Sequence, residues 1–173
     1  MKHFLILLFF VLVIVPLKAQ EPMASGVNLK SSAQKMGKLF VEKNYAQYVK
    51  FVHPKILKMF GGEEKMIEFL KKTVAETESQ GFIFKDVKIG EHSELIVLGN
   101  EIQSIIPQIL ELKTKEGRLI TTSYLLALSP DKGKKWYFID TAGKTLEELR
   151  TMFPSLSSKL IIPPASQPEF HND

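Results

Sequence analysis

The segment from Arg118 to Asp140, RLITTSYLLALSPDKGKKWYFID, most constrains what this chain can fold into. It holds two runs of apolar and aromatic residues on either side of Ser129-Pro130-Asp131-Lys132-Gly133. Proline, aspartate and glycine favour tight turns, so the segment predicts a β-hairpin. Side chains alternate along a strand, so Trp136 and Phe138 should share one face of the sheet, opposite Tyr137 and Ile139. The rest of the chain is expected to pack in layers against this hairpin.

The register of the hairpin stays open at the level of sequence. Pairing of Ser129 with Lys134 places Asp140 opposite Ser123, whereas a loop one residue shorter places it opposite Tyr124. A shift of one residue exchanges the faces of a strand. The direction of the Asp140 side chain therefore depends on the geometry of the turn.

Residues 1–19 have the pattern of a signal peptide. Lys2 gives a basic start, residues 4–15 are uninterrupted apolar residues, and Ala19 supplies a small residue at the expected cleavage site. The apolar run is too short to span a bilayer, which needs about 20 residues. We therefore expect an exported protein, periplasmic or secreted after cleavage near Ala19, with no stable membrane insertion afterwards.

Composition and charge exclude several classes of protein. The chain has 173 residues, of which 45% are hydrophobic and 24% charged, which suits one globular domain. It contains no cysteine, so it can form no disulfide and no thiol nucleophile. Loss of Lys2 and Lys18 with the leader lowers the net charge from +4 to +2. The lysines are scattered among glutamates, which argues against a nucleic-acid-binding surface.

Helical patterns fill the first part of the expected mature chain. We expect a flexible lead-in over 20–30, followed by a helix that starts at a capping box formed by Ser31 and Gln34. A second helical piece follows from Tyr45, and His53-Pro54 breaks it. Pro54 opens a third helix that Gly61-Gly62 ends, and the longest helix covers 63–80.

The remaining pattern is that of strands and one short helix. Strand-like segments begin at Phe82, and 101–113 forms a long strand in which Pro107 predicts an edge or a bulge. After the hairpin, a capping box at Thr145 opens a helix that Pro154 stops. The order predicts an α+β fold, with N-terminal helices packed on a curved, mostly antiparallel sheet and a short C-terminal helix. We place the domain at 31–162 and a Pro-containing polar tail at 163–173.

Three features together resemble the nuclear-transport-factor-2-like (NTF2-like) superfamily, the cone-shaped, cystatin-like or SnoaL-like α+β barrels. These are helices first, the His53-Pro54 pair at a helix junction, and a closing hairpin that ends Trp-Tyr-Phe-Ile-Asp. The likeness covers about 31–153. It implies a pocket inside the cone, and the superfamily includes isomerases, cyclases, dehydratases and non-catalytic binding modules. It also implies that a homodimer could form through the open face of the sheet.

Two residues are candidates for acid–base catalysis. The resemblance implies that Asp140, at the end of the closing strand, could place its carboxylate in the cone, although an aspartate at a strand end also forms turns. His53 could act as a general base, but it could equally serve as the N-cap of the helix that Pro54 opens. We favour the structural role for both residues.

Aromatic residues are the candidates for ligand binding. Tyr48, Tyr124, Trp136 and Phe138 would line a pocket in the cone, although buried tyrosine and tryptophan side chains also belong to ordinary cores. The histidines His53 and His92 have no spacing that suits a metal site, so we expect neither a metal nor a cofactor.

Two hypotheses of function follow, from different classes. In the one we prefer, the protein is an exported, non-catalytic module that binds a small apolar ligand or a partner protein. In the other it is a small isomerase or cyclase that uses Asp140 or His53 as its acid–base residue. A buried carboxylate and a tyrosine facing one cavity would favour the enzyme, and an apolar cavity without titratable walls would favour binding.

Overall fold

The structure, a computed structural model, describes residues 21–141, 143–164 and 166–172. The expected signal peptide over 1–19 lies outside these residues. The helices are α1 (Glu21–Val41), α2 (Tyr45–Tyr48), the 3₁₀ helix η1 (Val49–Phe51), α3 (Pro54–Met59), α4 (Glu63–Ser79) and α5 (Leu146–Met152). The strands are β1 (Ile83–Ile89), β2 (Ile96–Leu98), β3 (Glu101–Lys113), β4 (Gly117–Ser129), β5 (Tyr137–Asp140) and β6 (Glu169–Asn172).

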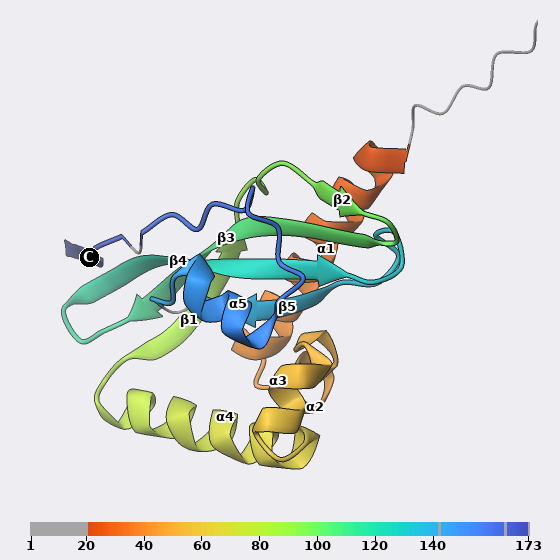
Figure 1. Cartoon of the computed structure of the whole chain (residues 1–173). Coiled ribbons are helices and arrows are strands. Elements are labelled where there is room, and N and C mark those ends of the chain that lie inside the picture. The colour runs from red at the N-terminus through yellow and green to blue at the C-terminus, as the bar shows by residue number, and fades with distance from the viewer. Residues whose placement is uncertain (1–20, 142, 165, 173) are drawn as a thin grey trace, which may run out of the picture.

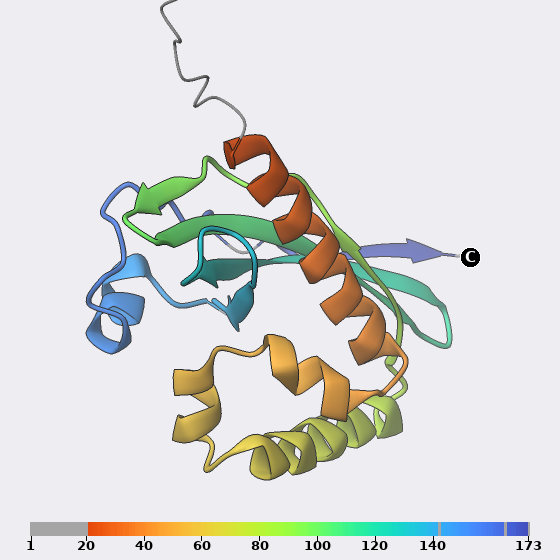
Figure 2. The same cartoon turned by 90° about the vertical axis from the view of Figure 1, so that its right-hand side faces the viewer.

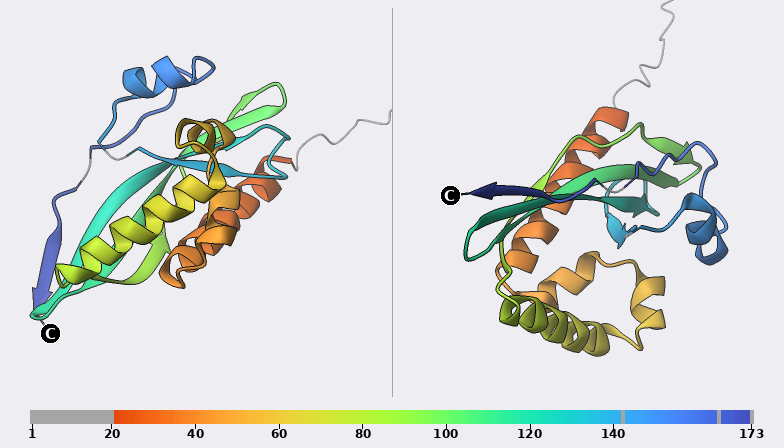
Figure 3. Two further views of the ribbon diagram at one scale, coloured as in Figure 1. Left: turned by 90° about the horizontal axis from the view of Figure 1, so that it is seen from below. Right: turned by 90° about the vertical axis from the view of Figure 1, so that its left-hand side faces the viewer.

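The fold is α+β, with one curved antiparallel sheet that does not close into a barrel (Figure 1). The strand order is β1-β3-β4-β5, and β2 and β6 pair with β3 and β4 respectively. α1 crosses one face of the sheet, which we call the inner face, and α2, α3 and α4 follow it at one end (Figure 2). α5 lies on the opposite, outer face (Figure 3). Among the described residues, no helix is both long enough and apolar enough to span a membrane.

The first helix begins ten residues earlier than the sequence suggested. Residues 21–30, expected as a lead-in, belong to α1, and the capping box expected at Ser31 is absent because Ser31 lies within the helix. At Gly26 the helix packs closely against the loop after β1, since a Cβ there would lie 2.6 Å from Nε2 of His92. The Asn28 side chain donates to the carbonyl of Gly133. These tertiary contacts stabilise α1 through Gly26, although a glycine by itself disfavours a helix.

The predictions for the short helices are confirmed. α2 begins at Tyr45 as predicted, and Asn44 caps it by accepting a hydrogen bond from the amide of Gln47. Pro54 opens α3, and Gly62 immediately precedes α4. The capping box at Thr145 is present, with the Thr145 and Glu148 side chains each bonded to the other's backbone amide.

β3 and β4 form the central hairpin of the sheet. They pair from Ile102 opposite Ser129 to Lys113 opposite Arg118. Pro107 lies in this strand without a bulge, but it has the predicted edge locally, because β1 pairs with β3 only as far as Gln108. Its carbonyl accepts from the Gly90 amide, just where β1 ends. The N–H and C=O of one residue point to the same side of a strand, and the Pro107 carbonyl points away from β4. The N–H that proline lacks would therefore not have bonded to β4 either.

The hairpin between β4 and β5 is present, but neither expected register is observed. Leu128 pairs with Tyr137, so Asp140 lies opposite Leu125. The loop is longer than expected because side chains organise it. The Ser129 hydroxyl accepts from the Gly133 amide, and the Asp131 carboxylate accepts from the Ser129 hydroxyl. Lys132 adopts a φ of 60° within this loop.

The chain after α5 returns along the sheet and ends as a strand. Gln103, fully buried on β3, donates to the Ser155 carbonyl and accepts from the Ser157 amide, which fixes the chain after the helix. In the predicted polar tail, β6 pairs with residues 117–120 of β4. Gly117 allows this pairing, because a Cβ there would lie 2.1 Å from the His171 carbonyl oxygen.

Candidate functional site

β5 separates two apolar cores. As predicted, Trp136 and Phe138 face one side, where they pack with α1 residues such as Met36. Ile139 faces the other side and packs with Leu149 of α5. A side chain of this strand therefore belongs either to the inner face or to the outer face of the sheet.

Asp140 lies on the inner face, because it shares the parity of Phe138. Its carboxylate oxygen Oδ2 lies 3.5 Å from Nε2 of Gln108, which donates at 2.9 Å to the Ser123 hydroxyl. Burial, and then the negative charge of Asp140, raise the pKa of the Tyr48 phenol. Asp140 and Tyr48 therefore share one polar environment together with Gln108 and Ser123, which we call the inner polar cluster. Gln108 and Ser123 were not predicted from the sequence, although each is a polar residue at an inward-facing position of an otherwise apolar strand.

His53 lies on the outer face. Its ring packs edge-on against Phe153, at 4.9 Å between centroids, and against Tyr137, at 5.8 Å. Its Nδ1 accepts the amide N–H of Lys55, so His53 is the N-cap of α3, the role that we favoured. Burial lowers the pKa of the imidazole, Glu101 opposes this shift, and Lys55 adds to it. The structure therefore does not bring His53 and Asp140 together.

The remaining candidates for ligand binding also lie in different parts of the structure. Trp136 and Phe138 are 1% and 2% exposed and are core residues packed with α1. The indole N–H of Trp136 has no hydrogen-bond partner among the described residues. Tyr124, by contrast, lines a groove of about 630 Å³.

This groove, which we call the β4 groove, exists because two short strands leave part of β4 uncovered. β5 pairs with residues 125–128 and β6 with residues 117–120, so 121–124 face neither strand. The lining residues are Thr121, Thr122, Ser123, Tyr124, Thr141, Gly143, Lys144, Thr145, Leu146, Ile162, Pro163 and Pro164.

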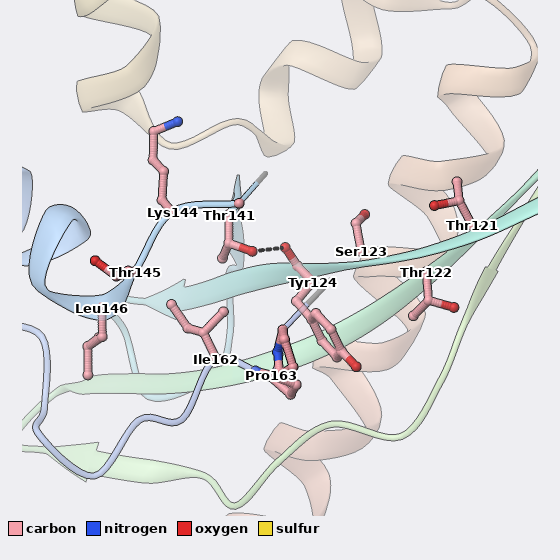
Figure 4. A pocket seen from close by; sticks show the side chains of 12 residues that line it. Thr121, Thr122, Ser123, Tyr124, Thr141, Lys144, Thr145, Leu146, Ile162 and Pro163 are labelled. Carbon is pink, nitrogen blue, oxygen red and sulfur yellow. Dashed lines mark hydrogen bonds between the residues drawn. The ribbon is translucent and has the colours of Figure 1, made fainter. Parts of the chain in front are cut away.

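The two sides of the β4 groove differ in chemistry. Figure 4 shows Thr121, Ser123 and Lys144 on one side of the β4 ribbon, and the Tyr124 ring with Leu146, Ile162 and Pro163 on the other. The Thr141 hydroxyl and amide both bond to the Tyr124 carbonyl, which holds the strand end in place. The groove thus joins an apolar wall to a row of hydroxyl groups and one amine.

A second groove, of about 460 Å³, lies at the other end of α5. Its lining residues, which define the His53 groove, are His53, Pro54, Lys55, Glu101, Leu128, Pro130, Tyr137, Met152, Phe153, Pro154 and Ser155. Leu146, at the start of α5, lines the β4 groove, and Met152, at its end, lines the His53 groove. α5 therefore separates the two grooves.

The described residues contain no group of three or more histidine, aspartate or glutamate side chains placed to hold a metal ion. Comparison with protein-family models, with curated proteins and with solved structures found no match for this chain. The geometry of the chain itself is therefore the basis for the function proposed below.

Proposed function

We propose that this protein is an exported NTF2-like module that binds a small, largely apolar ligand in the β4 groove without catalysing a reaction. The support for the NTF2-like assignment is the order of elements, with helices before a curved antiparallel sheet and a helix-covered inner face. The support for export is the leader pattern of residues 1–19.

The composition of the β4 groove carries the proposal of binding. Its size falls in the range of small-molecule sites, roughly 300–1,000 Å³. Among the residues that line it, the ionisable groups are Lys144 and Tyr124, and none is a carboxylate or an imidazole. Such a wall can bury an apolar ligand body and orient its polar end through the amine and hydroxyl groups. It offers no acid–base pair.

Binding of the anionic fluorophore anilinonaphthalene sulfonate tests this proposal. Replacement of the half-buried Ile162 by serine removes part of the apolar wall and should raise the probe's Kd by about fivefold to tenfold. Ile161→Ser is the matched control, because Ile161 is 77% exposed and does not line the groove. An equal effect of the two variants on Kd, or no effect of Ile162→Ser, contradicts binding in this groove.

The alternative is a small enzyme of the isomerase or cyclase kind, and the inner polar cluster is the observation that favours it. Asp140 would act as the base and the Tyr48 phenol, kept protonated by its raised pKa, as the hydrogen-bond donor to an oxyanion. Exchange of the α-protons of small ketones in D₂O, followed by NMR, tests this reading. An exchange rate that exceeds the buffer rate and falls to it in Asp140→Asn would support the enzyme.

A further inference from the structure

The His53 groove has an aromatic wall of defined geometry. The His53 ring stands nearly perpendicular to the Phe153 ring, with an interplanar angle of 85°, and is tilted by 68° from the Tyr137 ring. Met152 and Leu128 extend the wall with apolar surface. An apolar side chain entering the groove would therefore contact rings on adjacent sides, which favours its burial.

Groups of opposite charge lie beside this wall. Glu101 and Lys55 both line the groove, and both act electrostatically on the His53 imidazole. The Lys55 ammonium donates to the Met152 carbonyl and lies 5.4 Å from the centre of the Phe153 ring. The Glu101 carboxylate accepts a hydrogen bond from the Gln103 amide. Both charged groups are thus held in position by neighbouring residues.

The third polar group at the groove is the imidazole N–H of His53. Because Nδ1 accepts the Lys55 amide N–H, the proton of the neutral ring is on Nε2. The groove therefore presents a carboxylate acceptor, an ammonium donor and an imidazole donor beside three aromatic rings.

We propose that the His53 groove binds a small zwitterion with an apolar side chain, that is, a free amino acid or a dipeptide. The ligand ammonium bonds to Glu101, its carboxylate bonds to Lys55 and to Nε2 of His53, and its side chain packs against Tyr137 and Phe153. Neither a purely cationic nor a purely anionic ligand matches this pairing, because each would meet one like charge. This site is distinct from the β4 groove and does not rest on the function proposed for it.

Titration calorimetry with L-phenylalanine and with L-leucyl-L-leucine tests this inference, and N-acetyl-L-phenylalanine amide is the neutral comparison. We expect at least one zwitterion to bind, and the neutral compound to bind at least tenfold more weakly because it lacks both charged contacts. The preferred zwitterion distinguishes an amino-acid site from a dipeptide site. Equal affinity for the neutral compound, or no binding of either zwitterion, overturns the inference.

Charge-neutral variants locate the site. Glu101→Gln keeps the size of the side chain and should weaken binding of the zwitterion by about tenfold. The matched control is Glu116→Gln, in the turn between β3 and β4 at the far end of the sheet. Lys55→Gln should also weaken binding, with Lys58→Gln, on the same helix but outside the groove, as its control. An equal loss in a variant and its control overturns the assignment.

The two proposals fail in distinguishable ways. Ile162→Ser should leave zwitterion binding unchanged, because Ile162 lines the β4 groove alone. Thermal unfolding of each variant shows whether it folds. If Glu101→Gln does not fold, the Lys55→Gln and Lys58→Gln pair still decides between the outcomes.

Discussion

His53 and Asp140, the two candidates for acid–base chemistry, lie on opposite faces of the strand β5. The His53 ring packs on Tyr137 at the outer face, whereas the Asp140 carboxylate lies near Gln108 at the inner face. The strand and its cores stand between them, so no single ligand can contact both. A catalytic role for either residue would require a separate site with its own partners.

The capping role of His53 predicts a specific pH dependence of stability. Because burial lowers the pKa of the folded-state imidazole below its usual 6.5, the unfolded state takes up the proton first as the pH falls. The free energy of unfolding should therefore decrease as the pH is lowered from 7.5 to 5.5. His53→Asn keeps an N-cap acceptor but removes the titrating group, so its melting temperature should change less over this interval.

The exposed His171 of β6 provides the control for that measurement. His171→Asn should retain the pH dependence of the unmodified protein, since this exposed side chain of β6 lies far from the start of α3 and does not cap it. If His53→Asn and the unmodified protein lose stability in parallel, His53 does not cause the dependence.

The glycines of α1 predict two contrasting substitutions. A Cβ at Gly37 would lie 2.7 Å from Cγ1 of Val87, a β-branched side chain of the sheet. Gly37→Ala should therefore lower the free energy of unfolding by about 1–3 kcal/mol through overpacking. The close contact at Gly26 is with the end of the His92 side chain, which can rotate away. Gly26→Ala should be neutral, or stabilising by up to about 1 kcal/mol through helix propensity. Urea unfolding measures both, and an equal loss in the two variants would refute this account.

Gly117 predicts a local effect at the C-terminal strand. Gly117→Ala places a Cβ against the His171 carbonyl and forces an alanine to a φ of 152°. We expect β6 to separate from β4, because all four β6 residues are exposed and little burial holds them. Amide hydrogen exchange at 169–172 should accelerate at least tenfold while β3 keeps its protection. Gly99→Ala, in the turn between β2 and β3 with nothing near its Cβ, is the control and should leave β6 protected.

The single tryptophan predicts a clear optical signal. Trp136 is 1% exposed and its indole N–H has no hydrogen-bond partner within the part of the chain that the structure describes, so its surroundings are apolar. Its fluorescence maximum should lie at shorter wavelength than that of free tryptophan and should shift to longer wavelength on unfolding. The transition should coincide with that measured by circular dichroism, because Trp136 packs with α1 and β3 residues of the central core. An emission maximum at the free-tryptophan wavelength before unfolding would contradict this burial.

The sequence predicted those elements whose signals are local. The N-caps at His53 and Thr145 and the glycine that precedes α4 depend on residues within one turn, and all are observed. The facing of Trp136 and Phe138 depends only on alternation along one strand. The start of α1 and the pairing of β6 depend on contacts distant in sequence, such as Gly26 with His92 and Gly117 with His171. No local pattern reports such contacts.

The candidate site was predictable to a lesser degree. Tyr124 was predicted to line a pocket inside the cone, whereas the structure places it in the β4 groove, beside Lys144 and Ile162 from segments that only the fold brings together. The residue opposite Asp140 could not be inferred, because the Ser129 and Asp131 side chains organise a longer loop than the turn residues suggest.

The edge of β4 pairs with β5 over one stretch and with β6 over another, which has a consequence for how binding could change in related chains. The uncovered stretch 121–124 is bounded by the ends of β5 and β6. At about 3.4 Å per residue, these four residues span about 14 Å. Extension of β6 by two residues toward the groove would halve the opening without altering any residue that lines it. The length of ligand that the β4 groove accepts is therefore set by where two strands stop, and a single insertion or deletion in the chain that connects them could change it.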